Sequence, residues 1–275
     1  NDGKREIELI SSSATAQQYD QILTHALNGD AASTVKGAVV DDVSALTTAK
    51  TLSLKGATSV TAKLQSNGTD KDLTSTDLHA KVTAIDLNNQ TAILDATDLA
   101  KSITGSGTYS IKDSDASIAG LAAAKFTGKA ITITNEATVD HLATISAKSG
   151  AISYTKLTDT AAKIAGSLSD IKKDVAVKIN TEAEAKEAAD IDARVATIGA
   201  TLTLTTVTDT AAELAGNTSA LKSRIVKLKD GEVSNAANYK KIVDAQPSSF
   251  SGAVVDDVSA LTHGQTLTLT GATSV

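Results

Sequence analysis

One stretch of sequence occurs twice in this chain, and it limits the possible folds more than any other feature. Residues 37–60 read GAVVDDVSALTTAKTLSLKGATSV, and residues 252–275 read GAVVDDVSALTHGQTLTLTGATSV. The copies differ only at positions 48, 49, 50, 53 and 55 of the first. Such self-similarity is typical of repeat architectures. It predicts a single repeat array over residues 1–275, with a higher-order repeat of about 215 residues, and it argues against a self-contained enzyme.

Short segments with alternating apolar and polar residues recur along the chain, which predicts β-strands. Most of their starts are separated by about 21 to 30 residues, within the range of supersecondary repeats. The predicted strands are residues 5–10, 51–56, 81–87, 108–112, 130–134, 151–155, 175–179, 201–205, 224–229 and 266–270.

Between these strands the apolar residues follow a helical period. Residues 14–26, 181–198 and 235–245 are predicted helices, and Thr181 with Glu184 predicts a capping box. Inside the duplicated block, Val39, Val43 and Leu46 form a helical stripe, which Val254, Val258 and Leu261 repeat.

A second repeat supports the same period. Residues 158–166 read TDTAAKIAG, and residues 208–216 read TDTAAELAG. Asp159 or Thr160, and Asp209 or Thr210, stand where a helix N-cap is expected. The predicted unit is therefore a strand, a capped short helix and a loop.

Strands joined by helices run parallel, and strands that alternate with Thr, Ser and Lys have one solvated face. We therefore predict an α/β solenoid of about 23–25-residue strand–helix repeats with a parallel sheet, of the leucine-rich-repeat kind. A parallel β-helix and a tandem of small domains are the alternatives.

The composition favours an extracellular structural role. There is no Cys, no Met and one Pro, so disulfides, thiolate metal sites and cysteine nucleophiles are excluded. A chain that does not begin with Met is expected to be processed or to be a section of a longer one. A net charge of −6 disfavours nucleic acid and anionic membranes as partners. No apolar run approaches the length that spans a bilayer.

Few residues suggest chemistry. The repeated acidic pairs, Asp41 with Asp42 and Asp256 with Asp257, are candidate calcium ligands, although acidic residues in a first helical turn explain them better. The four histidines are too scattered for a zinc site, and no cofactor motif is found. The sequons at Asn67 and Asn217 and the threonine-rich strands are candidate glycosylation or glycan-binding features.

The words TDTAAKIAG, TDTAAELAG, GAVVDDVSALT and TLTLTGATSV resemble the Ala/Thr-rich "DTAA" α/β repeats of very large secreted and cell-surface proteins of bacteria, notably cyanobacteria. The resemblance implies a surface layer, an adhesin or an extracellular filament, with export by type I secretion. The calcium-binding nonapeptides of that class are absent from this sequence, and the resemblance assigns no site residue.

These observations together predict a non-enzymatic, extracellular repeat protein that forms a rod, filament or surface layer by end-to-end stacking. Neither end of the sequence has the polar character of a capping repeat, which is the reason to expect self-association. The alternative is an adhesin-type module that binds a glycan or a partner protein.

Overall fold

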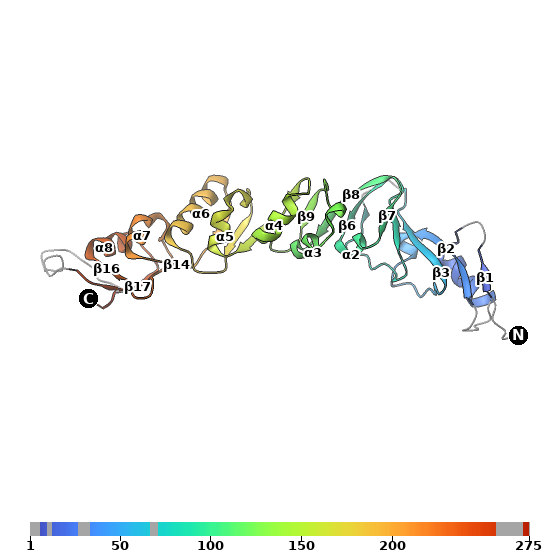
Figure 1. Cartoon of the computed structure of the whole chain (residues 1–275), viewed down its shortest axis with the longest axis horizontal. Helices are drawn as coiled ribbons and strands as arrows, with labels where there is room; N and C mark the ends of the chain where they lie inside the picture. Colours follow the sequence, from blue (N-terminus) through green and yellow to red (C-terminus); the bar gives the residue numbers. More distant parts are fainter. Residues whose placement is uncertain (1–5, 10–12, 27–33, 67–70, 257–271, 275) are drawn as a thin grey trace. The chain divides into compact units, whose positions relative to one another are not determined.

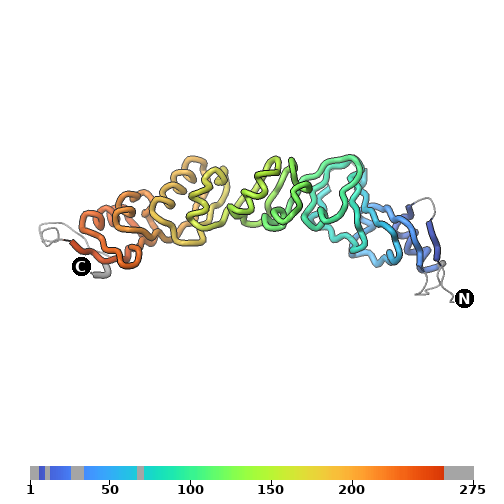
Figure 2. The backbone as a smooth tube through the Cα atoms, in the orientation of Figure 1, coloured from blue at the N-terminus to red at the C-terminus, as the bar shows by residue number. Residues whose placement is uncertain are grey.

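The computed structural model describes residues 6–9, 13–26, 34–66, 71–256 and 272–274 (Figure 1). The chain divides into two compact units. Unit 1 comprises residues 1–134 and 145–153, and unit 2 comprises residues 135–144 and 154–275. The path of each unit can be followed by colour in Figure 2.

Unit 1 contains two sheets, with strand orders β1-β2-β3-β5-β7 and β10-β9-β8-β6-β4. Its strands are β1 Glu6–Glu8, β2 Thr34–Asp42, β3 Ala57–Lys63, β4 Lys71–Asp72, β5 Ala84–Asp86, β6 Gln90–Leu94, β7 Ser102–Thr104, β8 Gly107–Asp113, β9 Ile131–Ile133 and β10 Ile152–Ser153. Its helices are α1 Ala16–Gln21, the π-helical turn η1 Ile22–Ala26, α2 Ala96–Leu99, α3 Asp115–Ala119 and the 3-10 turns η2 Val43–Ala45 and η3 Ala123–Lys125. The helix α4 Val139–Ser146 belongs partly to each unit.

Unit 2 has sheets of order β11-β12-β13 and β14-β15-β17-β16, and β18 pairs with β17. Its strands are β11 Lys156–Asp159, β12 Ala176–Ile179, β13 Thr201–Thr203, β14 Thr206–Asp209, β15 Ile225–Leu228, β16 Val233–Ser234, β17 Ser249–Val254 and β18 Ala272–Ser274. Its helices are α5 Ala161–Gly166, α6 Ala185–Ile198, α7 Ala211–Gly216, α8 Ala236–Asp244 and the 3-10 turns η4 Leu168–Asp170 and η5 Thr218–Ala220.

Every pairing between these named strands is parallel, as the alternation of strands and helices predicted. Along β12, exposed Ala176 and Lys178 alternate with buried Val177 and Ile179, so one face of the sheet is exposed to solvent and the other faces the core. The chain is thus a mixed α/β protein with several parallel sheets.

Extended segments pass from one sheet to the next. Residues 201–209 contain β13, which pairs with β12, and β14, which pairs with β15. The strand β17 changes partners within one sheet, because Ser249–Ser251 pairs with β15 and the following residues pair with β16 and β18.

The two copies of the duplicated block pair in the same way. Gly37 is paired with Ala57 and Ala38 with Ser59, with a register shift between them. In the second copy, Gly252 is paired with Ala272 and Ala253 with Ser274, with the shift at the same place. The two copies of the block, which are nearly identical in sequence, therefore share the same irregularity in strand pairing.

Some predicted elements are wrong. Residues 51–56 form no strand, and the strand lies at β3 instead. The stripe from Val39 to Leu46 is not a helix: Val39 belongs to β2, and only the short turn η2 follows. The equivalent Val254 lies in β17.

The long helix starts later than predicted, and its capping box is made by Glu184 and Glu187 and not by Thr181 and Glu184. At its other end, Gly199 adopts a φ of +70°, a left-handed conformation that glycine tolerates and that ends α6. The predicted strand at residues 266–270 and the repeated positions Val258 and Leu261 lie outside the described residues.

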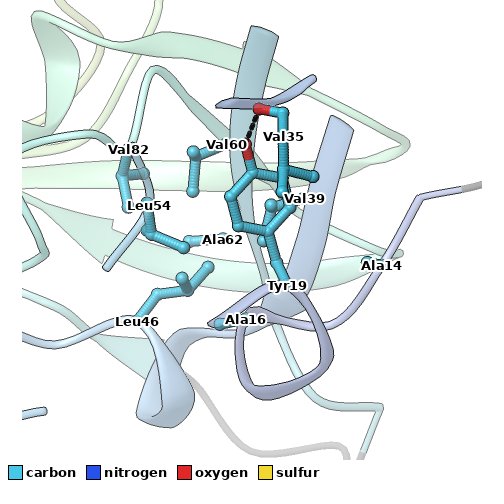
Figure 3. Packing of buried hydrophobic residues seen from close by; sticks show 10 residues of the cluster. All are labelled: Ala14, Ala16, Tyr19, Val35, Val39, Leu46, Leu54, Val60, Ala62 and Val82. Carbon is cyan, nitrogen blue, oxygen red and sulfur yellow. Dashed lines mark hydrogen bonds between the residues drawn. The ribbon is translucent and has the colours of Figure 1, made fainter. Parts of the chain in front are cut away.

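The core at the start of unit 1 surrounds Tyr19, a fully buried side chain (Figure 3). Its hydroxyl donates to the carbonyl oxygens of Val35 at 2.5 Å and Lys55 at 3.1 Å. Buried aliphatic side chains complete the cluster, among them Val39, Val60, Ala62, Leu46, Leu54 and Val82. Although aromatics are scarce in the sequence, this one lies at the centre of an aliphatic core.

Candidate functional site: the recurring aspartate junction

An aspartate at the end of a strand recurs throughout the described residues and connects two helices. In unit 2, Asp209 ends β14, and its Oδ2 accepts a hydrogen bond from the backbone N–H of Ala185, the first residue of α6, at 3.1 Å. The same bond joins Ala16 to Asp41 (2.9 Å), Ala96 to Asp113 (2.9 Å), Val139 to Asp159 (3.1 Å) and Ala236 to Asp256 (2.8 Å). The first N–H groups of a helix lack intrahelical partners and favour a negative charge, so each carboxylate stabilises a helix that begins 17 to 25 residues earlier.

The second carboxylate oxygen orders the chain that follows the strand. Asp209 Oδ1 accepts from the N–H of Thr210 at 2.8 Å. The corresponding distances are 2.8 Å for Asp41 and Asp42, 2.6 Å for Asp113 and Ser114, and 2.8 Å for Asp159 and Thr160. One side chain therefore fixes the start of the helix before the strand and the entry to the helix after it.

The next residue is the N-cap of the following short helix. Thr160 and Thr210 accept from the N–H groups of Lys163 and Glu213, as was predicted for one of the two residues at each site. Within each Asp-Thr pair, the threonine caps the short helix that follows it, and the aspartate accepts a hydrogen bond from the first residue of the preceding helix. The sequence analysis did not predict that the aspartate and the threonine have different roles. The constant spacing from the aspartate to the next buried aliphatic residue is the signal that could have indicated it.

An aliphatic side chain stands five residues after each aspartate. Leu46, Ile118, Ile164 and Leu214 occupy this position, and all four are fully buried. Asp256 has Leu261 at the same distance, outside the described residues. The junction motif is thus an aspartate, an N-cap residue and a buried Ile or Leu.

Charges around Asp209 keep it ionised. Burial raises the pKa of this carboxyl, but hydrogen bonds from Thr210, Lys229 and Ala185 together lower it below the usual range. Lys229 Nζ lies 3.1 Å from Asp209 and 2.8 Å from Glu184, and these hydrogen bonds raise the pKa of Lys229. The arrangement positions backbone segments on both sides of the aspartate.

One carboxylate in unit 1 is different. Asp98 in α2 is 3% exposed, and its Oδ2 has no hydrogen-bond partner. Burial and the nearby charge of Asp95 raise its pKa to about 6, against the opposing effect of Lys101, whose Nζ lies 3.7 Å away.

A second recurring contact holds the 3-10 turns. The hydroxyls of Tyr109 and Tyr154 donate to the carbonyl oxygens of Lys125 and Asp170, each 16 residues later. In the next repeat, Leu204 takes the place of Tyr154 and cannot donate. There, the carbonyl oxygen of Ala220 accepts a hydrogen bond from Arg224 Nη1 at 2.7 Å, and Arg224 also forms a bidentate ion pair with Asp192 of α6.

Three of the four candidate calcium ligands lie in the part of the chain that the structure describes, and each has a partner within its own unit. Asp41 and Asp256 are junction residues whose Oδ2 atoms hold α1 and α8, and Asp42 accepts from Gln65 Nε2 at 3.1 Å. Asp257 lies outside the described residues. Within the part of the chain that the structure describes, no group of three or more His, Asp or Glu side chains is placed to hold a metal ion. Calcium binding stays a prediction.

Three other candidates lie among the described residues. His25 lies beside α1, His79 Nδ1 accepts from the N–H of Lys81 at 3.1 Å, and Asn217 Nδ2 donates to Glu213 O at 2.9 Å. Asn67 and His263 fall outside the described residues. Among the helices described, none has the length and apolar character needed to cross a bilayer.

Comparison with family models, with curated proteins and with solved structures gives no match to this chain.

Proposed function

We propose that the chain is a structural, extracellular repeat protein that builds a rod, filament or surface layer by stacking repeats end to end. The observation that carries this proposal is the recurrence of the aspartate junction. Asp113, Asp159, Asp209 and Asp256 follow one another at nearly equal intervals, and the hydrogen bond to a helix N-terminus is the same at each. A side chain that links one segment of the chain to the next supports a repeated architecture, which stacking of repeats requires.

The same recurrence supports a solenoid. Each junction joins a strand to the helix before it and the helix after it, so each repeat is stabilised by its neighbours. We place the repeat at two strand–helix steps, since the aspartates recur at roughly twice the predicted step. The resemblance to the Ala/Thr-rich "DTAA" repeats of bacterial surface proteins fits this role and this location.

The test is the assembly state of the purified chain. Light scattering after size exclusion should show masses that grow with protein concentration, and electron microscopy should show elongated particles of variable length. A chain that stays monomeric at every concentration would contradict the proposal. The assembly state should be measured with calcium and with a chelator, because assembly that depends on the metal would support the acidic pairs as calcium ligands.

A binding module is the second candidate, supported by the polar outer faces of the sheets. Exposed Thr201 and Thr203 on β13 and exposed Ser249 and Ser251 on β17 present hydroxyls in rows. Such rows can hydrogen-bond to a glycan. Selective binding on a glycan array that is lost in Thr201→Ala/Thr203→Ala, without any self-association, would favour this candidate.

A further inference from the structure

A cavity of about 700 Å³ lies in unit 1, between the start of α1, the turn η2 and residues 50–52. All the elements that line it belong to the part of the chain that the structure describes. Its volume is in the range of small-molecule sites. Seven of its ten lining residues have polar side chains, and the other three are Ala16, Ala45 and Leu52. A ligand of this cavity must therefore be hydrophilic.

Two carboxylates fix the walls of the cavity. Asp20 Oδ1 accepts a hydrogen bond from the N–H of Ser53 at 2.8 Å, which ties α1 to the segment opposite. The junction residue Asp41 holds Ala16 N–H at 2.9 Å, and the Thr15 hydroxyl caps α1. The N–H groups at the start of α1 are thus already bonded, so a ligand must be recognised by the side chains.

Five of the lining side chains have polar atoms left for a ligand. Among the described residues, the only hydrogen bond to these side chains is the one that Asp20 Oδ1 accepts. The five are Gln17, Asp20, Ser44, Lys50 and Thr51. Together they present an ammonium, a carboxylate oxygen, an amide and two hydroxyls. Donors and acceptors are therefore mixed on one polar surface.

This mixture selects a class of ligand. An anion such as a phosphate would meet the carboxylates of Asp20 and Asp41, and a cation would meet the ammonium of Lys50. A neutral sugar avoids both conflicts, because each of its hydroxyls can donate and accept a hydrogen bond. Its C–H groups can lie on the small apolar surface of Ala45 and Leu52.

The second copy of the same element separates these side chains from the requirements of the fold. The helices α1 and α8 each start with an alanine whose N–H is held by a junction aspartate, and each has a tyrosine three residues later. The positions of three of the five side chains differ: Gln17, Asp20 and Lys50 correspond to Ala237, Lys240 and Gln265. A helix of this kind therefore forms without the glutamine and the aspartate.

We propose that the cavity between α1 and η2 binds a neutral sugar unit of an oligosaccharide. Asp20 accepts hydrogen bonds from the sugar hydroxyls, and Gln17 and Lys50 donate to its oxygens. The site goes beyond the proposed structural role, because it gives unit 1 a ligand of its own. It is also distinct from the hydroxyl rows on β13 and β17, which belong to other elements.

Nuclear magnetic resonance tests the site with defined probes. The isotope-labelled chain is titrated with maltose, cellobiose, lactose and chitobiose, and a neutral glycan array extends the panel. We expect at least one neutral sugar to shift the amide signals of residues 15–20 and 41–52 saturably at millimolar concentration. The absence of any such sugar would overturn the proposal, as would shifts confined to other parts of the chain.

Two variants assign the binding to the cavity. Gln17→Ala and Asp20→Lys introduce the residues that α8 has at these positions, so both should stay folded, as circular dichroism will show. We expect Asp20→Lys to weaken binding about tenfold or more, since a hydrogen bond to a charged group is lost. Glu8→Lys is the control, because it makes the same change of charge at an exposed residue outside the cavity. Equal affinities of Asp20→Lys and Glu8→Lys would overturn the proposal. Self-association should be the same in both variants, so the two proposals can fail independently.

Discussion

At the scale of single residues, the junction aspartates show why acidic residues recur in this sequence. In Asp209, each carboxylate oxygen has its own backbone partner, one in the preceding helix and one in the following N-cap. A short side chain at a strand end can reach both only if strand and helix are held in fixed relation. This role explains the first aspartate of each acidic pair in the duplicated block, Asp41 and Asp256.

Replacing a junction aspartate should destabilise unit 2. In Asp209→Asn the amide keeps one acceptor oxygen, loses the other and loses its attraction to Lys229. Leaving a buried N–H without a partner costs about 1–3 kcal/mol, and we expect a loss in that range in urea unfolding followed by circular dichroism. Asp190→Asn is the control, because Asp190 only pairs with Lys186 on the helix surface. A smaller loss for Asp209→Asn than for Asp190→Asn would contradict the bridging role.

The pH dependence of the same residue has a definite sign. The pKa of Asp209 is lower in the folded protein than in the unfolded chain, so its contribution is present above the unfolded value, near 3.8. The contribution is lost as the pH falls through the folded pKa. We expect acid unfolding of unit 2 to begin at a higher pH in Lys229→Met, which removes a hydrogen bond that holds this pKa down. An unchanged acid transition would show that the lysine has no influence.

Asp98 should behave in the opposite way. Its folded pKa of about 6 lies above the unfolded value of 3.8, so the folded state binds the proton more tightly. The stabilisation is full below the unfolded pKa and is lost as the pH rises through about 6. The charged groups that act on Asp98 are Asp95, which raises its pKa, and Lys101, which lowers it.

We therefore expect Asp98→Asn to stabilise unit 1 at neutral pH. One pKa unit corresponds to about 1.4 kcal/mol, so a gain on the order of 1–2 kcal/mol is expected at pH 7. The gain should vanish near pH 4, where the aspartic acid of the unmodified chain is itself neutral. Urea unfolding at both pH values measures this, and a variant that is less stable at pH 7 would refute the interpretation.

At the scale of elements, the sequence predicted some strands and missed others, among them β2, β6 and β17. Alternating residues such as those of β12 identify a half-buried strand by themselves, and the observed β5, β8, β9, β12 and β15 lie close to the predicted ranges. Residues 201–205 were predicted as one strand, but the chain leaves one sheet after Thr203 and enters another at Thr206. The sequence carries a signal of this change, because the alternation shifts by one residue at the doubled threonine 205–206: Val207 follows Leu204 by three residues.

The junction was only partly predictable. The Asp-Thr pair signals a helix start, and Thr160 and Thr210 are indeed N-caps. The bond from Asp209 to Ala185 spans 24 residues and depends on which strand lies beside which helix. The helical stripe through Val39 failed because Val39, like Val254, is a strand residue whose neighbours happen to repeat at helical spacing.

The tyrosine contacts give an element-scale prediction. Tyr154→Phe removes the donor to Asp170 O at the end of η4, while the ring stays buried. We expect a loss of about 1 kcal/mol, the usual net value of one hydrogen bond, with faster amide exchange at Ile171. Burial and then the charge of Asp170 raise the pKa of Tyr154 to about 12. Unchanged exchange in the variant would show that Arg194 alone, through its bonds to Leu168 O and Ile171 O, holds the turn.

At the scale of the whole molecule, the division into two units implies that mutations act locally. Ile191→Ala removes a fully buried side chain from unit 2, which costs about 2–5 kcal/mol. We expect unfolding to show two transitions, of which Ile191→Ala shifts one and Asp98→Asn the other. Differential scanning calorimetry of both variants measures this. A single transition that moves in both would show one cooperative block.

The spacing of the junctions also bears on how such a chain can change its length. Asp159 and Asp209 stand in the same local setting, each followed by Thr-Ala-Ala. Removing residues 160–209 would rejoin Asp159 to Thr210 and restore the wording Asp-Thr-Ala-Ala across the cut. Unequal recombination between the DNA segments that encode these two stretches would insert or delete a whole repeat and keep the Asp-Thr-Ala-Ala sequence at the joint.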